Sequence, residues 1–279
     1  KIILLYKIYK KASNLLKDVS FDIVTVQDEY YLALTGLILA KKFKIGLEIQ
    51  VHGFEKFQGI RKLIAKLVLA RADAVRTVSQ RLKNRLMQEF NVKEAKITVV
   101  PVYVEIKNHL RLELETKIDN KLIFLTVCRL APIKNVGLQI KSFARVVKKY
   151  PQSELWIVGD GPEKAHLKFE ISNLKIEKYV KLFGWQKNID QFYTQADVFM
   201  LTSNSEGWGL AIIEAASFGL PIIMTDVGCA GEFIKDKENG IVVGVGNEAE
   251  LEEAMLGLIE NNDLRQQLGE KARESALRL

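Results

Sequence analysis

The sequence predicts an α/β protein made of two domains, each a doubly wound parallel sheet. Its 279 residues, 48% of them hydrophobic, are enough to bury two cores. Short runs rich in β-branched residues alternate with amphipathic stretches almost throughout, and apolar strands between helices indicate parallel sheets covered on both faces. Residues 105–120 interrupt this alternation because they are polar and lack a clear period. We therefore expect two domains, residues 1–110 and 111–279.

The first domain is predicted from four strand-like runs and the helical periods between them. The runs are 21–28 (FDIVTVQD), 45–53 (IGLEIQVHG), 73–79 (DAVRTVS) and 97–104 (ITVVPVYV), with helices expected at 57–71 and 80–89. The chain begins at Lys1 in sequence that already reads as helix. We therefore expect the first strands of this domain to be missing from it.

The second domain is predicted from six further runs with helices between them. The runs are 122–130 (LIFLTVCRL), 154–162 (ELWIVGDGP), 179–185 (YVKLFGW), 197–204 (DVFMLTSN), 221–228 (PIIMTDVG) and 240–246 (GIVVGVG), and helical sequence follows from about residue 247. Ligands of doubly wound sheets bind at the carboxyl ends of the strands. The loops after these strands are therefore the candidate sites.

Composition excludes several classes of protein. No apolar run approaches the ~18 residues of a membrane-spanning helix, and no signal peptide is recognisable. Cys128 and Cys229 lack metal or redox spacing, which favours a reducing cytoplasm. His52, His109 and His166 lack ligand spacing, so a histidine-based metal centre is not expected. No metal and no cofactor are expected for the chain.

Positive charge is concentrated in the first part of the chain. Residues 1–105 carry 19 Lys and Arg against 10 Asp and Glu, whereas the rest carries 22 against 24. The stretch 59–73 (GIRKLIAKLVLARAD) alternates apolar and basic residues. It predicts either contact with an anionic membrane surface or an ordinary domain helix whose apolar face lies in the core. Nucleic acid is not expected as a partner, because aromatic residues do not interleave with the basic ones.

Two cations follow the first strand of the second domain. Arg129 and Lys134 precede a helix expected to begin near Asn135, and this arrangement suits a diphosphate. Ordinary solvated surface cations are the alternative. After the next strand, Gly159 begins a glycine turn that opens a helix at Pro162, which is also normal at a helix start. A dinucleotide fingerprint in 243–249 (VGVGNEA) is read as accidental, because 250–276 is helical throughout.

The stretch SEGWGLAIIEA, residues 205–215, places two carboxylates around a glycine-rich helix start. Gly207 and Gly209 allow close approach of a ligand, and the free amides of a helix beginning near Gly209 suit a phosphate. Glu206 and Glu214 could accept hydrogen bonds from sugar hydroxyls, or Glu214 could simply face water. After the next strand, a loop with Gly228, Gly231 and Glu232 is expected to open another helix, with Asp226 as a ligand or a helix cap.

The chain resembles the retaining glycosyltransferases of family 4, which have the GT-B fold of two Rossmann-like domains facing a cleft. The resemblance rests on Arg129 and Lys134, the GDG turn, and Glu206 followed after seven residues by Glu214. The GxPII-like segment with a later Gly and Glu also matches. It is strong over residues 121–246 and weaker in EIQVHG, ADAVRTVSQRLKNRL and ITVVP. The motif VPVYVE departs from the Pro-Asn-Gly turn common in the family.

The resemblance implies a donor site for a nucleotide sugar in the second domain and an acceptor side in the first. Arg129 and Lys134 would bind the diphosphate, Glu214 the ribose, and Glu206 with the amides of Gly207, Trp208, Gly209 and Leu210 the transferred sugar and phosphate. Gly159 and Phe183 would line the donor site, Phe183 beside the base. His52 would face the donor from the first domain, or it is a packing residue.

The implied reaction transfers a sugar with retention and without a metal to a polysaccharide, lipid-linked or small-molecule acceptor of the cell envelope. The protein would act in the cytoplasm, at the inner face of the membrane where the acceptor is lipid-linked. The alternatives are a nucleotide-sugar epimerase or phosphorylase on a similar frame, or a non-catalytic nucleotide-sugar-binding protein. The presence of all four motif residues favours an enzyme over a non-catalytic binding protein. They are Arg129, Lys134, Glu206 and Glu214.

Overall fold

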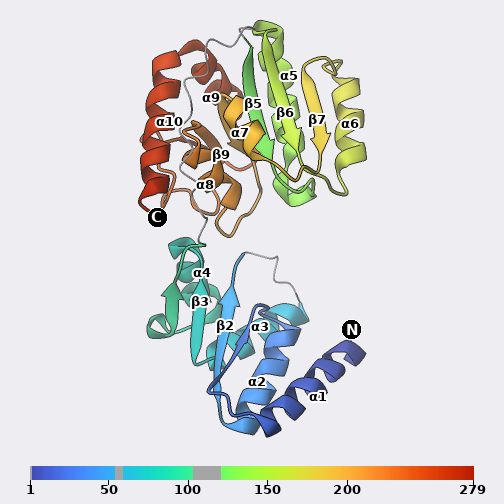
Figure 1. The fold of residues 1–279 in the computed structure, drawn as a ribbon, viewed down its shortest axis with the longest axis vertical. Coiled ribbons are helices and arrows are strands. Elements are labelled where there is room, and N and C mark those ends of the chain that lie inside the picture. The colour runs from blue at the N-terminus through green and yellow to red at the C-terminus, as the bar shows by residue number, and fades with distance from the viewer. Residues whose placement is uncertain (1, 54–58, 103–120) are drawn as a thin grey trace. The chain divides into compact units, whose positions relative to one another are not determined.

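The computed structural model describes residues 2–53, 59–102 and 121–279, and the chain divides into two compact units, residues 1–102 and 103–279. The boundary expected at residue 110 lies outside the described residues. Each unit contains one parallel β-sheet with helices packed on it (Figure 1). None of the described helices is long and apolar enough to cross a membrane.

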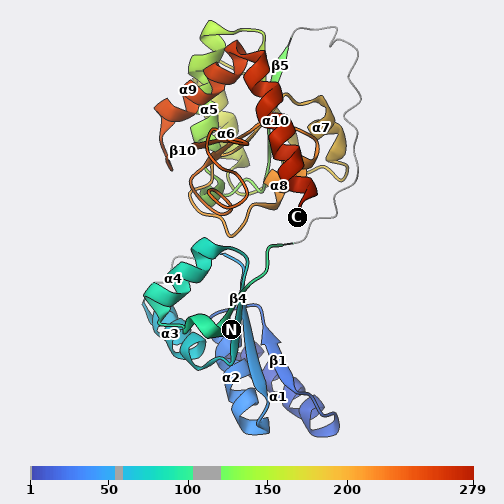
Figure 2. The ribbon, with the colours of Figure 1, turned by 90° about the vertical axis from the view of Figure 1, so that its left-hand side faces the viewer.

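The first unit contains four α-helices, one short 3₁₀ turn (Glu94–Lys96) and four strands among its described residues. The helices and strands are α1 (Ile2–Asp18), β1 (Ile23–Val26), α2 (Tyr31–Phe43), β2 (Gly46–Val51), α3 (Ile60–Arg71), β3 (Ala74–Thr77), α4 (Gln80–Phe90) and β4 (Ile97–Val99). The sheet order is β1-β2-β3-β4, the order in the chain. Helix α1 lies along α2 (Figure 2).

Only one face of this first sheet is buried among the described residues. Right-handed connections that always step in the same direction place their helices on the same face. Leu47, Ile49 and Val51 of β2 are accordingly buried, whereas Glu48 and Gln50 between them are partly exposed. In the described part of this unit, the helices therefore cover one face of the sheet, and the expected cover on both faces is absent from it.

The second unit contains a six-stranded sheet. Its elements are β5 (Leu122–Val127), α5 (Val136–Lys149), β6 (Ser153–Val158), α6 (Lys164–Asn173), β7 (Val180–Gly184), α7 (Asp190–Gln195), β8 (Val198–Leu201), α8 (Leu210–Ser217), β9 (Ile222–Thr225), β10 (Ile241–Val243), α9 (Glu248–Glu260) and α10 (Asn262–Leu277). A short 3₁₀ turn, Pro132–Lys134, precedes α5.

The strand order β10-β9-β8-β5-β6-β7 reverses direction between β5 and β8. Helix α5 packs with α6 and α9, and α10 packs with α8 (Figure 2). All residues of β6, β8 and β9 are buried, as expected for central strands covered on both sides. The reversal creates a topological switch point at the carboxyl ends of β5 and β8, which is where doubly wound sheets bind their ligands.

In each unit, an aspartate just before one strand accepts a hydrogen bond from the neighbouring strand. The Oδ2 atom of Asp73, just before β3, accepts the amide of Leu47 at 2.9 Å. Asp197, just before β8, accepts the amide of Ile123 at 2.7 Å in the same way. The Ala-Asp pair that precedes each strand therefore satisfies the first free amide of its neighbour.

The predicted strands are confirmed, and four element boundaries are corrected. The strand expected over 97–104 ends at Val99, shortly before Pro101, which cannot donate to a sheet. Helix α3 begins at Ile60, and helix α6 begins at Lys164 instead of Pro162. The helix expected over 250–276 is interrupted at Asn261, whose side chain accepts the amide of Leu264 and caps a new helix.

Candidate active site at the carboxyl edge of the second sheet

The switch point brings together the two loops in which the sequence predicts charged site residues. Arg129 and Lys134 follow β5, and Glu206 follows β8, which is the neighbour of β5 in the sheet. Arg129 is exposed, whereas Lys134 is partly buried in the 3₁₀ turn before α5. The sheet order, which the sequence does not state, therefore explains why residues about 70 positions apart meet.

Lys134 and Glu206 form an ion pair. The Nζ atom of Lys134 donates to Oε1 of Glu206, and the side chains are 22% and 11% exposed. The hydroxyl of Ser203 donates to the same Oε1 atom at 2.6 Å. A cation and a carboxylate predicted to act on a diphosphate and a sugar thus neutralise each other in this structure.

The two loops are joined by further hydrogen bonds. The amide of Asn204 donates to the carbonyl of Ile133 at 2.7 Å, and Nδ2 of Asn135 donates to Oδ1 of Asn204 at 3.1 Å. Asn135 has a positive φ of 47°, which turns the chain from the 3₁₀ turn into α5. The ion pair therefore lies between loops that hold each other in place.

Glu214 lies in the second turn of α8 and is half-buried. The hydroxyl of Tyr193, a buried residue of α7, donates to its Oε2 atom at 2.8 Å. Burial, and then the negative charge of Glu214, raise the pKa of Tyr193 well above its usual value. Tyr193 therefore remains a protonated donor that orients this carboxylate.

Glycine is required at position 159. Its φ is +136°, and a Cβ atom there would lie 1.8 Å from the carbonyl oxygen of Cys128. The amide of Gly159 donates to the carbonyl of Gly184 at 2.7 Å, which joins the ends of β6 and β7. The ring of Phe183 packs edge-on against Phe192 at a centroid distance of 4.8 Å, so its contact with a base stays a prediction.

The loop after β9 does not open a helix, so that expectation and the reading of Asp226 as a helix cap are wrong. Residues 226–240 form turns and isolated bridges instead. At Gly228, where φ is +57°, a Cβ atom would lie 2.8 Å from Cβ of Glu206 and from the carbonyl oxygen of Trp208. The glycine therefore permits this loop to pack directly behind Glu206.

Trp208 is only 5% exposed, so its indole ring lies inside the unit in this structure. Within the described residues, its Nε1 atom has no hydrogen-bond partner. Gly207 and Gly209 flank it, and Leu210, at the start of α8, is 44% exposed. The predicted contacts of the amides of residues 207–210 with the sugar and phosphate stay predictions.

His52 lies at the end of β2 in the first unit and is exposed. Its Nε2 atom is 3.4 Å from Oε1 of Gln50. Its predicted contact with the donor would involve residues of both units, and it stays a prediction.

The two cysteines form no disulfide, and burial raises the pKa of Cys128 to about 11 and that of Cys229 to about 12. Neither thiol is therefore a thiolate nucleophile at neutral pH.

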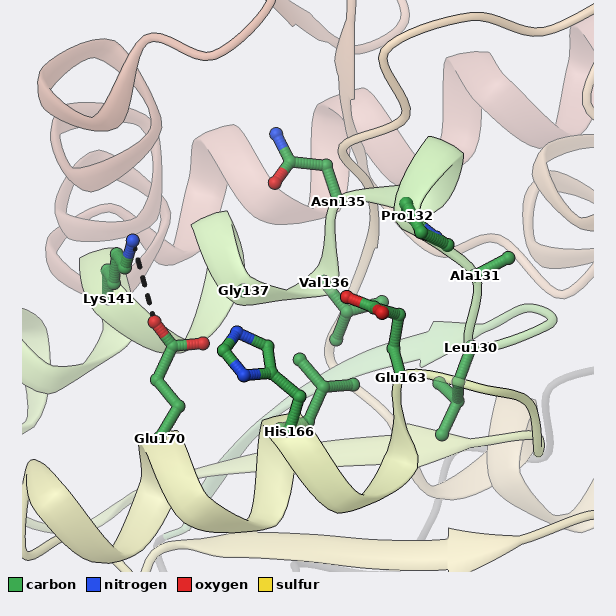
Figure 3. A pocket seen from close by; sticks show the side chains of 11 residues that line it. Leu130, Ala131, Pro132, Asn135, Val136, Gly137, Lys141, Glu163, His166 and Glu170 are labelled. Carbon is green, nitrogen blue, oxygen red and sulfur yellow. Dashed lines mark ion pairs between the residues drawn. The ribbon is translucent and has the colours of Figure 1, made fainter.

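A small cavity of about 170 Å³ opens between α5 and α6 (Figure 3). Glu163, His166 and Glu170 line it from α6 and the residue before it, and Lys141 of α5 pairs with Glu170 at 3.5 Å. Residues of the 130–136 loop also line it, but Arg129, Lys134 and Glu206 do not. Within the described residues, no three His, Cys, Asp or Glu side chains gather as metal ligands.

The chain is similar in sequence to two named synthases and in fold to a solved structure that contains UDP and glucose. The chain is 26% identical to alpha-monoglucosyldiacylglycerol synthase of Acholeplasma laidlawii, over 89% of this chain and 69% of that protein. It is 31% identical to N-acetyl-alpha-D-glucosaminyl L-malate synthase of Bacillus anthracis, over 56% of this chain and 41% of that protein. The structure of Anabaena Alr3699/HepE with UDP and glucose shares the fold, with a TM-score of 0.84 and 22% identity, over 99% of this chain and 76% of that chain.

Two family models divide the chain between them. The model for Glycosyltransferase Family 4 matches residues 2–107, and the model for Glycosyl transferases group 1 matches residues 113–275. The expected GT-B class of two parallel-sheet α/β domains is confirmed by the structural similarity. Because the second model alone covers more than half of the 279 residues, the chain belongs to the glycosyl transferases group 1 family and is a glycosyltransferase.

Proposed function

We propose that the second unit binds a nucleoside-diphosphate sugar and transfers its sugar, with retention and without a metal, to a hydroxyl acceptor. The observation that carries this proposal is the contact of Lys134 with Glu206 at the topological switch point. A cation and a carboxylate lie there beside the start of α8, whose first amides suit a phosphate. The UDP and glucose named for the Anabaena structure support a nucleotide-sugar donor.

In the proposed reaction, charge develops on the β-phosphate as the bond between it and the sugar C1 atom breaks. Arg129, Lys134 and the amides at the start of α8 stabilise this charge. Glu206 holds hydroxyls of the sugar, and Glu214, oriented by Tyr193, holds the ribose. The acceptor oxygen bonds to C1 on the face that the diphosphate leaves, and the acceptor proton passes to the departing phosphate.

Loss of Glu214 is expected to remove nucleotide binding. Thermal-shift screening against UDP-, GDP- and ADP-sugars should identify one stabilising donor for the wild type, and Glu214→Ala should abolish that shift, because its carboxylate pairs with the ribose diol. Quenching of the fluorescence of Trp185 on nucleotide addition gives a second readout, since this side chain is 71% exposed whereas Trp156 and Trp208 are buried. Tyr193→Phe keeps the carboxylate and should weaken the shift only partly. A Glu214→Ala variant that binds like the wild type would contradict the donor site.

The same donor tests the chemistry. With a suitable acceptor, NMR of the first-formed product should show the anomeric configuration of the donor, and EDTA should leave the rate unchanged, since Lys134 and Arg129 supply the positive charge. Release of nucleoside diphosphate should require the acceptor, which separates a transferase from an epimerase. An inverted product, or loss of activity in EDTA that Mg²⁺ restores, would overturn these parts of the proposal.

We further propose that the protein works at an anionic membrane surface and takes a lipid-linked acceptor. The name of the Acholeplasma relative, a synthase of a glucosyldiacylglycerol, supports this. Helix α3 buries only part of its apolar residues. Its buried residues are Ala65, Val68 and Leu69, whereas Ile60, Leu63 and Leu67 are 66%, 68% and 41% exposed. The last three, spaced by three and four residues, share one helix face and lie among Arg61, Lys62 and Lys66.

Substituting this exposed row should abolish binding to anionic vesicles. The wild type should sediment with vesicles containing phosphatidylglycerol, less so at high salt, and hardly with pure phosphatidylcholine, because basic residues and apolar side chains act together. Ile60→Ser, Leu63→Ser and Leu67→Ser combined should remove this binding. Phe169→Ser is the matched control, because Phe169 is 65% exposed on α6 of the other unit. Equal binding to both kinds of vesicle, or binding that the triple substitution leaves unchanged, would refute membrane contact through α3.

A further inference from the structure

Three polar side chains lie buried beneath the loops that carry Lys134 and Glu206. They are Thr126 in β5, Gln139 in α5 and Thr202 directly after β8, and each is 0% exposed. Their surroundings are the apolar core of the second unit, where a polar group is costly unless it forms hydrogen bonds. A set of three at the switch point therefore needs an explanation.

The hydrogen bonds of this set lead to the site. The Nε2 atom of Gln139 donates to the hydroxyl of Thr202 at 2.9 Å and, over a longer 3.3 Å, to that of Thr126. The hydroxyl of Thr202 donates in turn to the carbonyl of Asn135 at 3.1 Å, and the carbonyl of Lys134 is 3.5 Å away. Thr202 thus joins the loop after β8 to the backbone that carries Lys134.

Packing alone does not explain a glutamine at position 139. Its Oε1 atom is buried and, within the described residues, has no hydrogen-bond partner. An apolar side chain of similar size would fill the same space without leaving an acceptor unpaired. The amide is therefore better explained by the donor it supplies, which fixes the lone pairs of Thr202 and leaves its hydrogen to point at Asn135.

We propose that Gln139 and Thr202 are positioning residues that hold Lys134 against Glu206. Ser203, the next residue, completes the arrangement, because its hydroxyl contacts Glu206 and its carbonyl accepts the hydroxyl of Thr225 at 2.6 Å. Two consecutive buried residues, Thr202 and Ser203, in this way position both Lys134 and Glu206. The inference deepens the proposed function, since the cation it places is the one assigned to the leaving phosphate.

Thr202→Val keeps the shape of the side chain and removes its hydroxyl. Its kcat for transfer is expected to fall about tenfold or more, with kcat/KM falling equally, because an error of about 1 Å in a charge acting on the transition state can cost up to ~100-fold. Thr202→Ser should restore most of the rate. Ser142→Ala is the matched control, because its buried hydroxyl bonds a carbonyl at the same 3.1 Å, that of Glu248. It should lower Tm comparably and leave kcat unchanged.

A crystal structure of Thr202→Val gives a readout that does not depend on transfer. We expect the 132–135 loop to shift and the contact of Lys134 with Glu206 to lengthen. If both stay within about 0.5 Å of their places, or if kcat per folded enzyme equals that of Ser142→Ala, the positioning role is refuted. If the wild type binds no nucleotide sugar while Lys134 moves in the variant, the proposed function fails and the positioning role stands.

Discussion

Replacing Lys134 with alanine is expected to lower kcat/KM for transfer by about 100- to 1000-fold, the usual cost of removing one preorganised group that stabilises developing charge. Lys134 is 22% exposed and lies at the switch point, so its charge is only partly screened by water. The affinity for the nucleoside diphosphate should fall, whereas that for the monophosphate should change little. Calorimetric titration with both nucleotides, alongside initial rates, measures the two effects.

Lys141→Ala is the matched control for this variant. Lys141 lies seven residues further along, its side chain is 52% exposed, and it pairs with Glu170, away from Glu206. Its substitution should leave transfer and nucleotide affinity unchanged. Because Lys134→Ala also leaves Glu206 without its cation, Tm must be recorded for each variant. A folded Lys134→Ala enzyme with wild-type rates would contradict the role of this lysine.

Replacing Glu206 with glutamine is expected to change catalysis and product binding in opposite directions. Transfer should fall roughly 10- to 100-fold, because a hydrogen bond to a charged group contributes about 1.5–3 kcal/mol. The affinity for the nucleoside diphosphate should instead rise about fivefold, because about 1 kcal/mol of repulsion between the carboxylate and the phosphate is lost. Lys134, which donates to Glu206 in this structure, then becomes available to the phosphate.

Ser203→Ala separates charge from hydrogen bonding at the same oxygen atom. Ser203 donates to Oε1 of Glu206, so its loss disturbs the orientation of the carboxylate without removing the charge. We expect a modest fall in rate and no gain in affinity for the diphosphate. If Glu206→Gln binds the diphosphate no more tightly than Ser203→Ala does, the competition between Glu206 and phosphate for Lys134 is wrong.

Most of the fold follows from local patterns. Each predicted strand has a counterpart in the structure, because buried parallel strands produce short β-branched runs that are recognisable one at a time. The errors are at the ends of elements, in the break between α9 and α10, in the loop after β9, and in the cover expected on both faces of the first sheet. The segment with Gly228 and Gly231 has the glycine punctuation of a helix start, but it packs behind Glu206 and Trp208 instead. Local sequence does not distinguish these outcomes, because the deciding contacts are distant in the chain.

Several side chains that hydrogen-bond to the candidate site residues or to Thr202 were not found from the sequence. Ser203 lies three residues before Glu206, and a serine this near to a predicted carboxylate is a weak local signal of a contact between them. Tyr193 and Gln139 gave none, because a tyrosine in a short helix and a glutamine on an amphipathic one are ordinary. Their importance appears only when α7 and α5 pack beside the loops and bring them within hydrogen-bond distance of Glu214 and Thr202.

The sequence by itself determined the α/β class, the order of strands and helices, and the candidate charged residues, because periodicity, glycine turns and motif spacing are local properties. The tertiary structure alone decided that β5 lies beside β8, that Lys134 pairs with Glu206, and that Tyr193 holds Glu214. It also decided which apolar residues of α3 face outward. These outcomes depend on strand pairing and helix packing between distant segments, which form only when burial of the whole core selects one arrangement.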